Sequence, residues 1–192
     1  MTAKKVYLAS GSPRRAELLS QLGIEFETVN APIEEVALPN ESPDSFIRRM
    51  SIEKALDGFN KVAGAKVWVV AGDTMVVVDD RVLGKPKNQA DAIRMWMRLS
   101  GREHSVLSAV SVVYDGEVFC ALNQTRVWFR TLDAQEMQDY WLSGEPQGKA
   151  GAYAIQGLGA RFIERIEGSY SAVMGLPLFE LDQLLKQAHF YE

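Results

Sequence analysis

VYLASGSPRR (residues 6–15) predicts a short buried strand that leads directly into a helix. Residues 6–9 are apolar, as expected of a strand in the interior of a sheet. Ser12 and Pro13 are residue types preferred at the N-cap and at the first position of a helix. Gly23 is typical of the residue that ends a helix. The segment therefore predicts a strand-to-helix junction near the N-terminus.

Two cations stand at the start of this helix. Arg14 and Arg15 occupy its N2 and N3 positions, where the positive end of the helix dipole disfavours them. Backbone N–H groups, the hydroxyls of Ser10 and Ser12 and two guanidinium groups together suit a bound phosphate. The alternative is that both arginines point to solvent or pair with nearby glutamates.

The composition favours one folded, mildly acidic domain. The chain has 192 residues, 47% of them apolar, so we expect a single domain over residues 1–192. Lys plus Arg is 21 and Asp plus Glu is 25, which gives a net charge of −4 and argues against a nucleic-acid partner.

The cysteine and histidine content limits the kind of metal site, and the lack of long apolar segments bears on the cellular compartment. Cys120 is the only cysteine and His104 and His189 the only histidines, so a Cys/His zinc site is excluded. A metal would have to be a hard ion held by carboxylates and substrate phosphates. Residues 1–5 show no signal-peptide core and no apolar run is long enough to span a membrane, so we expect a cytoplasmic protein without a membrane partner.

Strands and helices alternate along the rest of the chain. The apolar and turn patterns predict further strands over residues 24–29, 67–71, 75–78, 106–114, 118–122 and 124–129. Helices are predicted after Ser42-Pro43, over residues 89–99, after an Asp133–Glu136 capping box, and from residues 176–177 to 187. Residues 31–40 and 144–159 are expected to be irregular. The mixture predicts an α/β fold with parallel crossovers at its N-terminal end.

Two ionisable residues stand in apolar surroundings. Asp73 lies between the predicted strands 67–71 and 75–78, where a carboxylate is costly unless it is paired or binds a metal. Lys54 continues the apolar stripe of a predicted helix, four residues after Met50. Its side chain either extends to the surface or projects into a polar site.

Three other positions are candidates with plain alternatives. Lys85 precedes Pro86, which favours an extended backbone and fixes its direction, although an exposed loop lysine is an equal alternative. Glu34 and Glu35 are either solvated loop residues or ligands of a divalent metal. The Gln156 amide can donate and accept at once, which suits the edge of a base, but a solvated loop glutamine is the more common case.

Some known nucleotide and hydrolase motifs are missing. The chain contains no G-x-x-x-x-G-K-[ST] loop, and its closest match to a dinucleotide fingerprint, residues 157–162, lacks the last glycine. It also contains no G-x-S-x-G nucleophile elbow. A P-loop enzyme and a serine hydrolase are therefore not expected.

Eight segments, in order across nearly the whole chain, resemble the Maf family of nucleotide pyrophosphatases. They are LASGSPRR (8–15), IEE (33–35), EKA (53–55), GDT (72–74), GKP (84–86), KAGAY (149–153), IQG (155–157) and GLPL (175–178). Each segment alone is a weak signal, but the ordered set is specific.

The resemblance implies a fold similar to that of inosine triphosphatases. It would have a central mixed sheet flanked by helices and two lobes around a nucleotide-binding cleft. The implied activity is the hydrolysis of a nucleoside triphosphate to the monophosphate and pyrophosphate with a divalent cation, Mg²⁺ or Mn²⁺. A homodimer is conceivable on the same ground.

The resemblance also assigns roles to residues. Asp73 would be the catalytic carboxylate and, with Glu35, a metal ligand, while the phosphates would be held by Ser10, Arg15, Lys54 and Lys85. Substrate specificity would lie in Arg14, Thr74 and Gln156, which match the branch of the family that acts on dTTP and UTP. Such an activity would keep unwanted pyrimidine nucleotides, canonical or modified, out of nucleic acids. The alternative function is a nucleotide-binding regulator of cell division in which hydrolysis is incidental.

Overall fold

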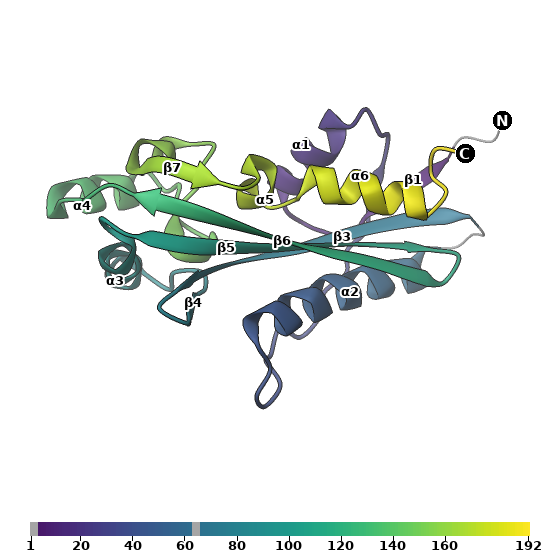
Figure 1. Cartoon of the computed structure of the whole chain (residues 1–192), viewed down its shortest axis with the longest axis horizontal. Helices are drawn as coiled ribbons and strands as arrows, with labels where there is room; N and C mark the ends of the chain where they lie inside the picture. The colour runs from purple at the N-terminus through teal and green to yellow at the C-terminus, as the bar shows by residue number, and fades with distance from the viewer. Residues whose placement is uncertain (1–3, 63–65) are drawn as a thin grey trace. The chain divides into compact units, whose positions relative to one another are not determined.

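The computed structural model (Figure 1) describes residues 4–62 and 66–192. The prediction that residues 1–5 hold no signal-peptide core rests in part on residues 1–3, which lie outside these ranges. The strands are β1 (Lys5–Leu8), β2 (Glu27–Thr28), β3 (Val67–Val78), β4 (Arg81–Leu83), β5 (Glu103–Tyr114), β6 (Glu117–Phe129) and β7 (Ile163–Glu167). The α-helices are α1 (Pro13–Gln21), α2 (Pro43–Lys61), α3 (Gln89–Leu99), α4 (Ala134–Leu142), α5 (Tyr170–Met174) and α6 (Leu178–Gln187). Two 3₁₀ helices are η1 (Ala150–Ala152) and η2 (Leu158–Phe162).

The strands form one mixed sheet, in the order β2-β1-β3-β5-β6-β7, with β4 paired to β3. β1 is parallel to both β2 and β3, and its Tyr7 lies opposite Glu27 on one side and Val69 on the other. β4 and β7 pair antiparallel with β3 and β6. The predicted α/β class with a mixed sheet is confirmed. The parallel crossovers lie at the N-terminal end because helices α1 and α2 carry the chain back to the same end of the sheet.

The chain divides into two compact units. The first unit consists of the described residues of Met1–Asp73, Ser108–Asn123 and Gly175–Glu192, and the second of Thr74–Leu107 and Gln124–Met174. The long strands β3, β5 and β6 each contribute residues to both units. In the described ranges, no helix is long and apolar enough to cross a membrane.

In the first unit, α2 lies on one side of β3, and α1 and α6 lie on the other (Figure 1). Successive side chains of β3 point alternately to the α2 side and to the α1 and α6 side of the sheet. Val69 and Ala71 join Ala55 of α2 in one buried cluster. Trp68, on the opposite face, donates its indole N–H to the Ala188 carbonyl oxygen at the end of α6 (2.7 Å).

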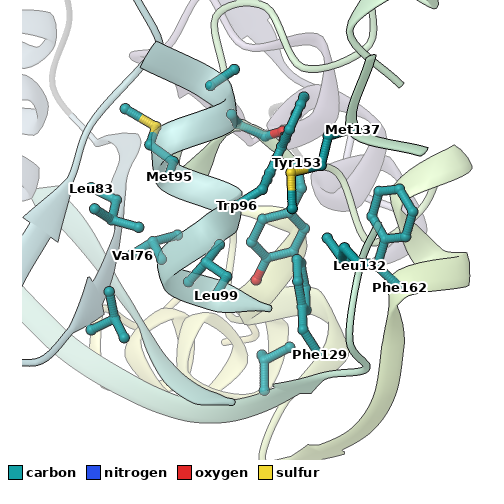
Figure 2. Close-up of a cluster of buried hydrophobic side chains, with 14 of the residues drawn as sticks. Val76, Leu83, Met95, Trp96, Leu99, Phe129, Leu132, Met137, Tyr153 and Phe162 are labelled. Carbon is teal, nitrogen blue, oxygen red and sulfur yellow. The ribbon is translucent and has the colours of Figure 1, made fainter. Parts of the chain in front are cut away.

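The second unit has its own core, shown in Figure 2, with Trp96 of α3 at its centre. Trp96 is fully buried and its indole N–H donates to the Ala152 carbonyl oxygen at 3.0 Å. Phe129 at the end of β6 packs against Tyr153, with ring centroids 4.9 Å apart and planes inclined by 72°. This edge-to-face packing ties the irregular segment after α4 to the sheet.

The helix predictions are confirmed at their starts. α3 has the predicted bounds, and the capping box of Asp133 and Glu136 is present at the start of α4. Ser42 accepts a hydrogen bond from the Ser45 N–H, as expected of an N-cap. Ser12 occupies the N-cap of α1 but makes no side-chain capping bond.

Several strand predictions need correction. Residues 67–71 and 75–78 belong to one strand, β3, so Asp73 lies inside a strand and not in a turn between two. Residues 118–122 and 124–129 likewise form the single strand β6. Both strands continue because partner strands satisfy their backbone groups, which outweighs the local turn preference of Gly72-Asp73 and of Asn123. β2 is limited to two residues, and the elements β4, β7 and α5 were not predicted.

Candidate active site

An ion-paired triad of two carboxylates and one lysine lies in the first unit. The Lys54 Nζ atom is 2.8 Å from Asp73 Oδ1 and 2.7 Å from Glu35 Oε1. The Lys54 and Asp73 side chains are 12% and 16% exposed, whereas Glu35 is 49% exposed. Of the two alternatives for Lys54, the structure therefore shows the second, in which the ammonium group enters a polar site.

Strand alternation explains why Asp73 meets Lys54. Val69, Ala71 and Asp73 are two residues apart along β3, so their side chains share the face covered by α2. Lys54 stands next to Ala55, which packs on that face. The ion pair offsets the cost of placing a carboxylate within an apolar strand.

Helix α2 is fixed to the sheet one turn before Lys54. The Ser51 and Ser111 hydroxyls are 2.8 Å apart, and both side chains are fully buried. One turn after Lys54, a β-carbon on Gly58 would stand only 2.7 Å from the Ala9 β-carbon. This close approach of α2 to the residue that follows β1 requires glycine, and it sets how near the sheet the Lys54 backbone lies.

Arg49 holds the loop that carries Glu35. Its guanidinium donates from Nε and Nη2 to the two oxygens of Glu41 at 2.7 Å, and Nη2 also donates to the Val36 carbonyl oxygen at 2.9 Å. The hydrogen bonds from Arg49 lower the pKa of Glu41 to about 2. Because Arg49 and Lys54 share one helix, this bidentate pair fixes the loop relative to the triad. The sequence analysis did not single out Arg49 or Glu41, since eight residues separate them and only the fold brings their charges together.

Arg15 is held on the other face of β3. Its Nε donates to the Gly175 carbonyl oxygen at 2.8 Å, and its Nη1 donates to Ser10 Oγ at 3.2 Å. A β-carbon on Gly72 would stand 3.4 Å from Arg15 Nε and 3.1 Å from the Ala109 carbonyl oxygen, so glycine leaves room for the guanidinium. Arg15 is therefore directed into the protein and not to solvent.

Electrostatics at Arg15 combine burial with two nearby acids. Burial lowers the pKa of Arg15, and the charges of Asp73 and Glu35 act in the opposite direction. Arg14 lowers the pKa of Arg15 by repulsion, while burial lowers the pKa of Arg14 itself. Arginine stays charged at neutral pH under such shifts, so the two guanidinium groups concentrate positive charge at the start of α1.

A pocket of about 360 Å³ adjoins the start of α1. It is lined by Ser10, Gly11, Ser12, Pro13, Ala16, Thr28, Val29 and Asn30. Ser10 Oγ accepts hydrogen bonds from the Ser12 N–H and from Arg15 Nη1, both at 3.2 Å, so its orientation is fixed. A helix N-terminus and hydroxyl groups at one pocket, one of them bonded to a guanidinium, form a typical environment for a phosphate group.

The structure brings together five predicted site residues in the first unit: Ser10, Arg15, Glu35, Lys54 and Asp73. Three others belong to the second unit. Thr74 follows Asp73 in β3, Lys85 is exposed in the segment after β4, and Gln156 is exposed in a turn before η2. The Gly151 N–H donates to the carbonyl oxygen of Gly84, the residue before Lys85, at 3.1 Å.

The triad provides a test of the predicted divalent cation. Two carboxylate oxygens, from Glu35 and Asp73, lie within 2.8 Å of one positive nitrogen, so the protein already holds a cation between them. No group of three or more potential ligand side chains occurs among residues 4–62 and 66–192. One or two carboxylates, completed by water and substrate phosphates, are the usual protein ligands of Mg²⁺. The residues present therefore fit a metal that arrives with a triphosphate.

Comparisons with known proteins match one family over nearly the whole chain. The family model described as Maf-like protein matches residues 5–188. A dTTP/UTP pyrophosphatase of Hydrogenovibrio crunogenus is 57% identical over 188 residues, which cover 98% of each chain. Proteins of the same name from Vibrio cholerae and Photobacterium profundum are 54% and 50% identical, and the matches cover 96% and 97% of this chain and 98% and 97% of theirs. With the family model matched over residues 5–188 and relatives of 50–57% identity, the chain that carries the Asp73–Lys54–Glu35 triad belongs to the family of Maf-like proteins.

Proposed function

We propose that this protein hydrolyses dTTP and UTP to the monophosphate and pyrophosphate. The observation that carries the proposal is the Asp73 carboxylate, which is 16% exposed, paired with Lys54 and placed inside a strand. The names of relatives at 50–57% identity over nearly their full length support the choice of substrate. Such an enzyme limits misincorporation of nucleotides, and because its substrates belong to the cytoplasmic nucleotide pool we place it there.

Phosphate binding is the proposed task of the cations. Cleavage of the α–β phosphoanhydride releases a highly charged pyrophosphate, so positive groups fixed around it lower the barrier. Arg15 is fixed by Ser10 and the Gly175 carbonyl oxygen, which directs its guanidinium before any substrate binds. Lys54 and Lys85 supply further positive charge in this proposal.

Asp73 is the proposed proton acceptor. In the hydrolytic step, an oxygen–hydrogen bond of water breaks as its proton passes to the Asp73 carboxylate. The water oxygen bonds to the α-phosphorus, and the bond to the bridging oxygen of the leaving pyrophosphate breaks. Lys54 ion-pairs with Asp73 in the structure. If the Lys54 ammonium group instead paired with an incoming phosphate, the Asp73 carboxylate would be able to accept the proton.

Glu35 and Asp73, which now share the Lys54 ammonium group, would hold a divalent cation. When bound, it would neutralise charge on the phosphate oxygens. A shift of Lys54 towards the triphosphate would leave both carboxylates available as ligands.

Base selection is proposed for Arg14, Thr74 and Gln156. A uracil or thymine edge presents two carbonyl acceptors around one N–H donor, and an amide side chain can both donate and accept. An acidic side chain at the place of Gln156 would repel those carbonyl oxygens. Gln156 is exposed, as a residue that contacts a ligand must be before the ligand arrives.

The deciding experiment is a substrate panel with identification of the products. Purified protein is incubated with each nucleoside triphosphate and Mg²⁺ or Mn²⁺, and pyrophosphate and orthophosphate are measured separately. We expect pyrophosphate from dTTP and UTP. Release of orthophosphate would refute the reaction, and turnover of CTP or GTP with dTTP and UTP untouched would refute the substrate choice. Tight binding without turnover would favour a nucleotide-binding regulator, and sedimentation of the same sample tests the proposed homodimer.

A further inference from the structure

The turn that carries Gln156 is fastened to α4 and to the segment that follows it. The Gly157 N–H donates to the Ala154 carbonyl oxygen at 3.4 Å, so residues 154–157 form a turn with Gln156 in its third position. At the start of this turn, the Ala154 N–H donates to the Tyr140 hydroxyl at 3.2 Å. The same hydroxyl donates to Glu145 Oε1 at 2.7 Å.

Glu145 also holds the end of the turn. Its Oε2 accepts the Leu158 N–H at 2.8 Å and its Oε1 accepts the Gly159 N–H at 3.0 Å, at the first residues of η2. Burial raises the pKa of Glu145, but the hydrogen bonds from Tyr140, Gly159 and Leu158 outweigh it and leave this pKa below its usual value. The carboxylate is therefore charged at neutral pH, which strengthens each bond that it accepts.

Glycines let the carboxylate approach the turn this closely. A β-carbon on Gly157 would stand 2.1 Å from Glu145 Oε2. A β-carbon on Gly159 would stand 2.6 Å from the Tyr140 hydroxyl and 2.8 Å from the Ala154 carbonyl oxygen. A side chain at Gly159 would meet the backbone of Ala154, and one at Gly157 would displace the Glu145 carboxylate, so both glycines are needed for this arrangement of the turn, the hydroxyl and the carboxylate.

We propose that Glu145 is the positioning residue for base selection, because it binds the two residues that follow the Gln156 turn directly and the first residue of the turn through Tyr140, and so fixes where the Gln156 amide points. This inference rests on the proposed function, in which Gln156 contacts the base. Gln156 itself is exposed, so its direction depends on the backbone of the turn. Misplacement of a contacting group by about 1 Å can cost up to about a hundredfold in rate.

The test is a double-mutant cycle between Glu145→Gln and Gln156→Ala. The amide of Glu145→Gln keeps the shape of the side chain but loses the charge and one acceptor. We expect the ratio of kcat/KM for dTTP to that for CTP to fall about tenfold, mainly through a higher KM for dTTP. Binding of inorganic tripolyphosphate, which has no base, should be unchanged. In the Gln156→Ala background, Glu145→Gln should cause no further loss of selectivity.

Two further variants keep the test decisive. Tyr140→Phe removes only the link between the start of the turn and Glu145, so it should lower selectivity by a smaller factor, and it carries the test if Glu145→Gln does not fold. Glu164→Gln, which removes an exposed carboxylate of β7, is the matched control and should leave selectivity intact. Hydrogen exchange at the Leu158 and Gly159 amides should be faster in Glu145→Gln than in the unmodified protein, and it should be unchanged in Tyr140→Phe and in the Glu164→Gln control.

Each outcome decides the proposal. Unchanged selectivity in Glu145→Gln, despite faster exchange of the two amides, would overturn it. Equal losses for dTTP, CTP and tripolyphosphate would also overturn it, since they indicate a general structural role. If Gln156→Ala itself keeps full selectivity, the inference also fails, and the failure is then traced to the role of Gln156 in the proposed function.

Discussion

Replacing Asp73 by asparagine is the sharpest single test of the site. Asn is nearly isosteric with Asp, and its Oδ1 can still accept a hydrogen bond from Lys54, which lies 2.8 Å from Asp73 Oδ1. Lys54 also keeps its ion pair with Glu35 at 2.7 Å, so no unpaired charge is left behind. The substitution therefore removes the ability to accept a proton while leaving the surrounding contacts in place.

The expected magnitudes differ between stability and rate. Exchange of the ion pair for a hydrogen bond between the Lys54 ammonium group and an uncharged amide oxygen should lower the free energy of unfolding by about 1 kcal/mol. Loss of the proton acceptor should lower kcat at least about a hundredfold, which corresponds to about 2.7 kcal/mol in the activation barrier. Removal of a negative charge near the phosphates should leave metal-free binding of dTTP as tight as before or tighter.

The assay is pyrophosphate release from dTTP at saturating Mg²⁺, with metal-free binding measured by calorimetry. Asp57→Asn is the matched control, because Asp57 also pairs with a lysine of α2, Lys61 (2.6 Å), but lies outside the triad. It should turn over dTTP at the unmodified rate. Near-normal turnover by Asp73→Asn, in a protein that binds dTTP, would refute the reasoning and remove Asp73 from the chemistry.

Three further predictions concern the framework of the two units. Gly58→Ala places a β-carbon 2.7 Å from the β-carbon of Ala9, and urea unfolding should show a net loss of about 1 kcal/mol once the gain in helix propensity is deducted; a stabilised variant would contradict this packing. Gly151→Ala combines a φ of 67° with a β-carbon 2.9 Å from Val76 Cγ2, so it should cost more than Gly148→Ala, where φ is 70° but nothing lies within 4 Å. We expect a difference of about 1–3 kcal/mol in unfolding free energy, and equal losses would show that only backbone strain matters. Burial lowers the pKa of His104 to about 3, below its value of 6.5 in the unfolded chain, so its contribution to stability is present above pH 6.5 and is lost as pH falls towards 3. Between pH 7 and 5 the free energy of unfolding should fall by about 2 kcal/mol more in the unmodified protein than in His104→Gln, as measured by denaturant unfolding. Parallel pH profiles of the two proteins would contradict a neutral buried imidazole.

The helices were predictable because their signals are local. Ser42 caps α2 through its own neighbour three residues on, and the capping box of Asp133 and Glu136 lies within one turn. The strands were predicted less well, since a strand is satisfied by partners far along the chain. Asp73 illustrates this difference, because Gly72-Asp73 favours a turn locally but lies inside a twelve-residue strand.

The residues of the site could be selected from the sequence as types, but not as contacts. The unfavourable position of Arg15 at a helix start indicated an anion site, and the apolar surroundings of Asp73 indicated a paired carboxylate. The partners that satisfy them, Lys54 for Asp73 and the Gly175 carbonyl oxygen for Arg15, stand 19 and 160 residues away. No local pattern contains such distances.

The sequence alone therefore determined the helix starts, the α/β class and the set of candidate residues, because each depends on residue type and short spacing. Only the tertiary structure decided that Glu35 and Asp73 share one ammonium group, that Ser10 orients Arg15, and that Glu145 binds the Gln156 turn. The physical reason is that these contacts exist only once strand pairing and core packing have brought distant segments within hydrogen-bond range.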